Sequence, residues 1–180
     1  MTKKKSQLIN AGEIKVTVIG EGAVGKTSLI RRWAEGKFEK SYLATLGVDI
    51  THKTVQVENL NFKMILWDIA GQHRYKQFRN TFYTGTQGII IVADVTNPAS
   101  LDALPSWKVE LETFVDKDLP TILIANKSDL EDERKVGIKS IQQVGKVIGI
   151  PSDFIFETSA LVGTNVESAF QSIAALIKKQ

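Results

Sequence analysis

The residues at positions 20–27 have the types and the order that bind phosphate. They read Gly-Glu-Gly-Ala-Val-Gly-Lys-Thr and match the pattern G-x-x-x-x-G-K-S/T between an apolar stretch and a helical one. The glycines allow backbone N–H groups to surround phosphate oxygens at a helix N-terminus, where the helix dipole favours an anion. Lys26 can reach the β- and γ-phosphates, and the Thr27 hydroxyl can bind Mg²⁺. The motif predicts a nucleoside triphosphate site, with a chance glycine-rich turn as the alternative. Its expected contacts are Glu21, Gly22, Ala23, Val24, Gly25, Lys26, Thr27 and Ser28.

A second group of reactive residues closes the apolar stretch 62–68. Asp68 ends this stretch, and a carboxylate at a strand end can hold Mg²⁺ through water. Gly71 can offer its N–H to a γ-phosphate because no side chain blocks the approach. The amide of Gln72 both donates and accepts, which suits it to orient an attacking water. Asp68 alone would be an ordinary turn residue, and the upstream phosphate motif favours the metal site.

A third group of residues has the chemistry to select the base. Residues 126–129 read Asn-Lys-Ser-Asp and follow the apolar stretch 121–125. A carboxylate accepts two hydrogen bonds from a base with adjacent N–H donors, which guanine has at N1 and its 2-amino group and adenine lacks. The carboxylate therefore predicts guanine, although the isolated tetrapeptide also fits a surface turn. Asn126 would tie neighbouring loops together. The expected base-site residues are Asn126, Lys127, Asp129, Ser159 and Ala160.

The elements that position these groups alternate between buried strands and amphipathic helices. Strands are predicted at 14–19, 48–57, 62–68, 88–94, 121–125 and 154–156, and helices at 27–35, 100–115 and 139–149. A last helix is predicted from a capping box, Thr164 to Glu167, and from an apolar face of Val166, Ala169, Phe170, Ile173 and Ile177. This pattern predicts an α/β fold of the P-loop NTPase kind, with a mostly parallel six-stranded sheet, one antiparallel edge strand and helices on both faces. Ligands of such sheets lie beyond the carboxyl ends of the strands, where every motif falls.

With these motifs in this order, the chain resembles the Ras superfamily of small GTPases over about residues 13–178. It is most similar to the Rab branch through residues 45–49, 82–85 and 95–97, which read Thr-Leu-Gly-Val-Asp, Phe-Tyr-Thr-Gly and Val-Thr-Asn. The resemblance implies a switch that binds GDP or GTP with Mg²⁺ and slowly hydrolyses GTP.

The same resemblance implies further site residues and partners. Thr45 would bind Mg²⁺ when GTP is present, Phe38 would pack edge-on to the guanine, and Tyr42 would cover the phosphates. For the two aromatic side chains the alternative is that they cover the core. Effectors, exchange factors and activating proteins would bind residues of about 36–50 and 69–82.

The chain departs from a typical Rab sequence at several positions. Ile69 and His73 replace the usual Thr and Glu, and Ile50 replaces the usual Phe. The chain has no cysteine, so it lacks the prenylated C-terminal cysteines of that branch. We therefore expect no stable membrane anchor in this chain. Either a longer C-terminus was removed, or the protein is a divergent relative that works without a lipid.

Composition sets the remaining expectations. With 180 residues and 43% hydrophobic content, the chain suits one globular domain, which we assign to 13–180 after a flexible basic lead-in at 1–12. The three lysines at positions 3–5 suit a solvated tail or weak contact with acidic lipid. The net charge is +3, and the basic residues are spread along the chain between acidic ones, which does not indicate nucleic-acid binding. We expect a cytoplasmic monomer.

These residues suggest a hydrolytic mechanism. A water oriented by Gln72 would attack the γ-phosphate, and Lys26, Mg²⁺ and backbone amides would stabilise the charge. The arginines at 31 and 32 suit solvated charges better than a catalytic arginine, so we expect slow turnover that depends on a partner. His73 and Arg74 suit an exposed loop better than a catalytic base. The apolar side chains of Ile50, Met64 and Trp67 suit a partner surface or the core equally. The alternatives are a non-hydrolysing guanine-nucleotide-binding module and, with less support, a kinase or ATPase.

Overall fold

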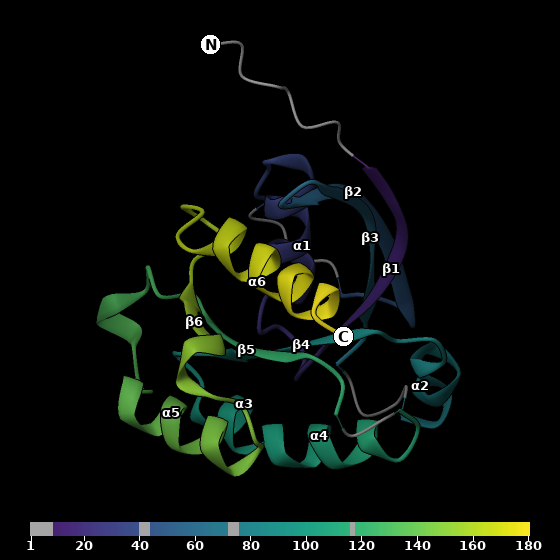
Figure 1. The fold of residues 1–180 in the computed structure, drawn as a ribbon. Helices are drawn as coiled ribbons and strands as arrows, with labels where there is room; N and C mark the ends of the chain where they lie inside the picture. Colours follow the sequence, from purple (N-terminus) through teal and green to yellow (C-terminus); the bar gives the residue numbers. More distant parts are fainter. Residues whose placement is uncertain (1–8, 40–43, 72–75, 116–117) are drawn as a thin grey trace, which may run out of the picture.

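A six-stranded sheet forms the centre of the protein (Figure 1). The computed structural model describes residues 9–39, 44–71, 76–115 and 118–180. The strand order is β2-β3-β1-β4-β5-β6, with β2 antiparallel to β3 and all other neighbours parallel. The strands are β1 (Ile9–Ile19), β2 (Val48–Val57), β3 (Leu60–Ile69), β4 (Gly88–Asp94), β5 (Thr121–Asn126) and β6 (Ile155–Thr158). The predicted sheet, with its single antiparallel edge strand, is confirmed.

Helices cover both faces of this sheet, as predicted (Figure 1). One face carries α1 (Lys26–Glu35) and α6 (Val166–Lys178), and the other carries α3 (Pro98–Asp102), α4 (Leu104–Glu112) and α5 (Ile138–Val147). The helix α2 (Lys76–Tyr83) follows β3, and short 3₁₀ turns occupy Glu131–Glu133 and Ser152–Phe154. All seven residues of β4 are buried, as an apolar strand covered on both faces requires. None of the helices in the described ranges has the length and apolar character that a bilayer crossing needs.

Two predicted boundaries differ from the structure. β1 begins at Ile9 rather than at 14, because Ile9 and Asn10 pair with the first residues of β3 before an irregularity in register. The predicted helix 100–115 is wrong in detail: it is two helices, separated at Ala103. Pro105 lies in the first turn of α4, where its missing N–H needs no helical partner, and it could not continue a helix from α3.

The start of α6 also differs from the prediction. Asn165, not Thr164, is the N-cap residue; its backbone is left-handed with φ 55°, and no side chain caps the helix. The side-chain amide of Asn165 instead donates to the Glu157 carbonyl at 2.8 Å, so the expected capping box is wrong. The predicted apolar face is correct: Phe170 is buried and stacks on Trp33, with ring centroids 4.6 Å apart.

Candidate nucleotide-binding site

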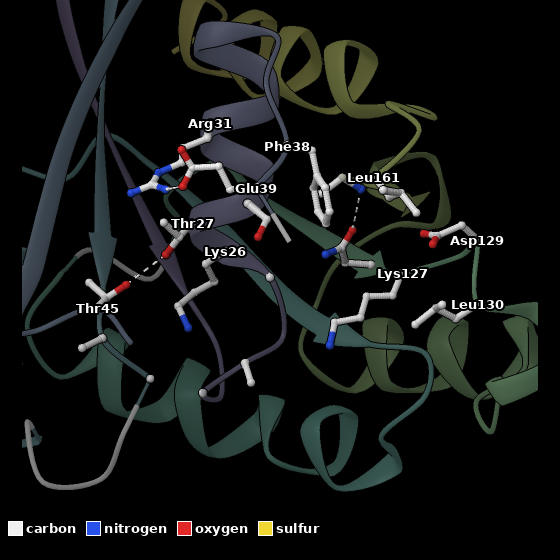
Figure 2. Close-up of a pocket in the computed structure, with 18 residues that line it drawn as sticks. Lys26, Thr27, Arg31, Phe38, Glu39, Thr45, Lys127, Asp129, Leu130 and Leu161 are labelled. Atoms are coloured by element: carbon white, nitrogen blue, oxygen red, sulfur yellow. Dashed lines mark hydrogen bonds and ion pairs between the residues drawn. The ribbon is translucent and has the colours of Figure 1, made fainter. Parts of the chain in front are cut away.

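A pocket of about 470 Å³ lies at the carboxyl ends of the parallel strands (Figure 2). It is lined by residues from the loops after β1, β3, β5 and β6 and from the first turns of α1. The predicted residues that line it are Gly22, Ala23, Gly25, Lys26, Thr27, Ser28, Phe38, Thr45, Gly71, Asn126, Lys127, Asp129 and Ala160. Segments up to about 140 residues apart in sequence therefore meet at one cavity, at the edge of the sheet where the fold predicts a ligand.

The loop between β1 and α1 needs its glycines for close packing. At Gly20 (φ +140°) an added Cβ would lie 2.2 Å from the carbonyl oxygen of Val92. At Gly25 (φ +98°) it would lie 2.3 Å from Nδ2 of Asn126, and Gly25 is also the N-cap of α1. No side chain caps this helix and no acid lies in its first turn, so its N–H groups and dipole remain suited to an anion.

Lys26 is the cation of this loop and is 6% exposed. Its ammonium donates to the carbonyl oxygens of Gly20 and Glu21, each at 2.8 Å. Burial lowers the pKa of Lys26 to about 8, although the nearby charges of Asp68 and Glu21 oppose this shift. A phosphate group would stabilise the ammonium and compete with the two carbonyls for its protons.

Three oxygen-bearing side chains converge beside Lys26. The Thr27 hydroxyl lies 2.9 Å from the Thr45 hydroxyl and donates to Oδ2 of Asp68. Thr45 donates to the same carboxylate oxygen at 3.5 Å. Asp68 is 2% exposed, and its second oxygen, Oδ1, has no hydrogen-bond partner among the described residues. Burial raises the pKa of Asp68, against the hydrogen bond from Thr27 and the charge of Lys26.

This oxygen set fits a magnesium ion. Mg²⁺ prefers hard oxygen ligands and is often held by one or two carboxylates together with water and phosphate oxygens. The described residues contain no group of three or more His, Cys, Asp or Glu side chains suited to a metal. A cation here would therefore depend on the two hydroxyls, on Asp68 and on oxygens of the ligand. An orphaned, buried carboxylate oxygen is the feature that such an ion would satisfy.

Gly71 brings the end of β3 against the phosphate-binding loop. It is buried, and an added Cβ would lie 2.4 Å from backbone atoms of Glu21 and Gly20 and 2.5 Å from the nitrogen of Gly22. No other residue type fits this contact without movement. Gln72, the next residue in the chain, lies outside the described residues, as do Tyr42, His73 and Arg74.

The far end of the pocket contains the predicted base site (Figure 2). Asn126 joins two loops, as expected: its Nδ2 donates to the Val24 carbonyl at 3.0 Å, and its Oδ1 accepts from Thr158 Oγ1 at 3.0 Å. Oδ1 of Asp129 accepts the Ser159 hydroxyl at 2.5 Å, which fixes the orientation of the carboxylate. Its other oxygen makes no hydrogen bond to the residues that the structure describes, and Asp129 lines the pocket.

Three predicted contacts lie behind the pocket wall and support it. The Val24 side chain is buried in the core, and its carbonyl holds Asn126. The Ser159 side chain is buried and holds Asp129. The carboxylate of Glu21 accepts the indole N–H of Trp107 at 2.9 Å. These residues shape the pocket without lining it.

Several functional contacts were missed by sequence reasoning. Asp94 at the end of β4 pairs with the ammonium of Lys127 at 2.6 Å and so fixes the lysine stem; its position at a strand end was the available signal. Arg31 pairs with Glu39 at 2.6 Å beside the pocket. Arg32 donates to the carbonyls of Ala160 (2.7 Å) and Gly36 (3.1 Å). The ion pair of Arg31 is solvent-exposed, in keeping with a solvated charge, whereas Arg32 also has a structural role because it holds the loop after β6.

The apolar residues that suited either a partner surface or the core differ in burial. Met64 is fully buried and belongs to the core. Ile50 is 50% exposed on β2. Trp67 is half-buried, with the Lys15 ammonium 3.6 Å from its ring centroid.

Known proteins to which this chain is similar belong to one family. The sequence profile of the Ras family matches residues 15–179. The Ras-related protein RABA4b of Arabidopsis thaliana is 39% identical over 163 residues, which cover 91% of this chain and 71% of the relative. RABD2a of the same plant is 36% identical over 166 residues, or 92% of this chain and 80% of the relative. Rab-1C of Dictyostelium discoideum is 34% identical over 166 residues, or 92% and 81%.

Proposed function

This chain belongs to the Ras superfamily of small GTPases and to its Rab branch, and we propose that it binds GDP and GTP with Mg²⁺ and slowly hydrolyses GTP. The observation that carries this proposal is that Lys26, Thr27 and Asp129 line one pocket of about 470 Å³, with Asp68 hydrogen-bonded to Thr27 at its wall. A cation for phosphate, an oxygen set for Mg²⁺ and a carboxylate for guanine then lie in the order in which a guanine nucleotide presents its parts.

Guanine recognition would depend on the free oxygen of Asp129. The Ser159 hydroxyl fixes the carboxylate at 2.5 Å, so that the N1–H and 2-amino groups of guanine meet an oriented acceptor. Adenine presents no such pair of donors and would leave the carboxylate unpaired, which is unfavourable in a partly buried site. Lys127, held by Asp94 at 2.6 Å, would lie along the base, and Phe38 would pack at its edge.

Phosphate recognition would depend on Lys26 and on the N–H groups of the loop before α1. Thr27, Thr45 and Asp68 would hold Mg²⁺, which supplies positive charge to the β- and γ-phosphates when bound. Lys26 would stabilise charge on the transferred group, and Gln72 would orient the attacking water. Positioning and electrostatics account for most of the catalysis in phosphoryl transfer.

Slow turnover is part of the proposal. Among the described residues, Arg31 is the arginine that lines the pocket, and its guanidinium pairs with Glu39 (Figure 2). We therefore expect a rate on the order of 10⁻⁴ s⁻¹, the scale of unassisted Ras. An activating protein would raise this rate.

The two loops around the γ-phosphate would form the switch. Thr45 and Gly71 both contact the phosphate site, so the presence of a γ-phosphate would order residues of about 36–50 and 69–82 into a surface for effectors. Leu46 and Ile50, which are 74% and 50% exposed, would contribute apolar contacts to that surface. We propose a role in trafficking or signalling of the Rab kind.

A single-turnover assay tests this function. The protein is loaded with GTP and Mg²⁺, and the bound nucleotide is followed by HPLC in the wild type, in Gln72→Leu and in Gln143→Leu. Gln143 lies exposed on α5, away from the pocket, and controls for the substitution itself. We expect slow conversion to GDP in the wild type and the control, and much less in Gln72→Leu. Stable GTP in all three proteins would instead support a non-hydrolysing binding module, and competition by ATP would contradict guanine selection.

A further inference from the structure

A chain of partly buried polar contacts leads from the phosphate-binding loop to α2. The carboxylate of Glu21 accepts the indole N–H of Trp107 at 2.9 Å. The guanidinium of Arg79 stacks on the Trp107 ring, with Cζ 4.0 Å from the centroid. Arg79 Nη2 pairs with Oε2 of Glu110 at 3.0 Å, and the Tyr83 hydroxyl donates to Oε1 of the same carboxylate at 2.9 Å. We call these five residues the Arg79 cluster.

The guanidinium of Arg79 is incompletely satisfied. It is 2% exposed, and its Nε and Nη1 groups have no hydrogen-bond partner among the described residues. A buried ion pair is weak evidence for stability, because the desolvation of both charges offsets their attraction. Unpaired buried donors increase that penalty. A shift of α2 that supplied acceptors to these two groups would remove this penalty.

Glu21 links the cluster to the phosphate site. Its backbone carbonyl accepts the Lys26 ammonium at 2.8 Å, and its carboxylate accepts Trp107. Gly71 packs against backbone atoms of the same residue, with an added Cβ 2.4 Å away. A phosphate that drew the ammonium of Lys26 away from this carbonyl would thus change the contacts of Glu21. Glu21 also touches Gly71 after β3 and, through Trp107, is linked to Arg79 of α2.

We infer that Arg79 is a positioning residue that couples the phosphate-binding loop to the placement of α2. The inference rests on the proposed function, because it deepens the account of how a γ-phosphate moves the switch. Arg79 acts through Trp107 and Glu21 and does not touch the nucleotide. A phosphate that changed the contacts of Glu21 would reach Arg79 through Trp107 and so change the relative free energies of the placements open to α2.

Tryptophan emission provides a readout that does not require hydrolysis. In a Trp33→Phe, Trp67→Phe background, Trp107 is the remaining tryptophan. We compare this protein with GDP or with a non-hydrolysable GTP analogue, each with Mg²⁺, and then add Arg79→Met. Lys108→Met is the matched control, because Lys108 is also a mostly buried cation that pairs within α4, with Glu112 at 3.2 Å.

The coupling predicts a specific pattern. Trp107 emission differs between the two nucleotides in the background protein and in Lys108→Met, and this difference disappears in Arg79→Met. The single-turnover hydrolysis rate of Arg79→Met falls about tenfold, within the range for residues that modulate coupling, and GDP affinity changes less than about threefold. Arg79→Lys, which keeps the charge near Glu110, restores part of the rate.

Other results would overturn the inference. If Arg79→Met lowers only the melting temperature and keeps both the emission difference and the rate, then Arg79 has a structural role alone. If Arg79→Met does not fold, Trp107→Phe replaces it, because a phenylalanine keeps the ring under Arg79 but cannot donate to Glu21. An unchanged hydrolysis rate in Trp107→Phe would refute the coupling. A wild type that binds GTP and never hydrolyses it would refute the enzymatic proposal, and an emission difference that still depends on Arg79 would leave the coupling intact.

Discussion

The buried ammonium of Lys26 makes the stability of the nucleotide-free protein depend on pH. Burial lowers the pKa of Lys26 from 10.5 to about 8. The folded protein therefore releases this proton at a lower pH than the unfolded chain, in which lysine keeps a pKa near 10.4. Because the unfolded state binds this proton more tightly between about pH 8 and 10.5, the contribution of Lys26 to the free energy of unfolding rises with pH across this window.

The size of the effect follows from the shift. The pKa values of the folded and unfolded states differ by about 2.5 units, and each unit corresponds to about 1.4 kcal/mol. The full gain is therefore about 3 kcal/mol and is complete only above about pH 10.5. Between pH 7.5 and 9.5 it amounts to about 2 kcal/mol. This is a large part of the stability of a typical domain, so it is measurable.

Lys26→Met isolates this contribution, because it keeps an apolar stem of similar length and removes the ammonium. Urea unfolding of both proteins is followed by circular dichroism in EDTA at several pH values from 7.5 to 9.5. The wild type should gain about 2 kcal/mol over the variant across that range. With saturating GDP and Mg²⁺ the gain of the wild type should shrink, because phosphate favours the ammonium. Parallel curves for the two nucleotide-free proteins would refute the reasoning.

Three further predictions follow from single contacts. Gly25→Ala should destabilise the protein by about 1–3 kcal/mol in urea unfolding, because an alanine is strained at φ +98° and its Cβ would lie 2.3 Å from Asn126 Nδ2. Asp129→Asn should weaken GDP binding roughly 10-fold to 100-fold in a fluorescence titration, since the acceptor for two guanine N–H groups is lost; unchanged affinity would contradict the base site. Burial and the Glu110 charge raise the pKa of Tyr83 well above its usual value. The contribution of Tyr83 to the free energy of unfolding is therefore present below about pH 10 and is lost as the pH rises above that value. Unfolding measured from pH 9 to 11 should therefore show the wild type losing stability relative to Tyr83→Phe.

The sequence predicted those site residues whose positions follow from a short motif or from the end of a strand. Lys26 and Thr27 belong to a motif whose spacing already specifies a loop and a helix N-terminus. Asp68 and Asp129 follow apolar strands, and a parallel sheet brings such strand ends to one edge whatever the details of packing. The placement of both carboxylates at this edge of the sheet follows from the order of the strands, and Asp129 lines the pocket there.

The contacts that the sequence did not reveal depend on side-chain directions between distant segments. Trp107 and Glu21 are 86 positions apart, and no periodicity indicates that their side chains meet. Arg79 lies in a polar stretch that suits an exposed helix, yet it is 2% exposed because Trp107 and Glu110 of α4 cover it. Thr164 is of a residue type that often caps helices, but the N-cap residue of α6 is Asn165, whose backbone is left-handed.

The two charged groups at the phosphate site have pKa shifts of opposite sign, and this opposition favours one kind of ligand. Burial lowers the pKa of Lys26 and raises that of Asp68, so it disfavours the charged form of both. An anion alone would stabilise the ammonium but repel the carboxylate, and a cation alone would do the reverse. Under the proposed function, a phosphate–magnesium pair would satisfy both groups together, because its anionic part would suit Lys26 and its cationic part would suit Asp68, whose Oδ1 has no partner among the described residues. We therefore expect nucleotide and metal each to raise the affinity for the other by the same factor.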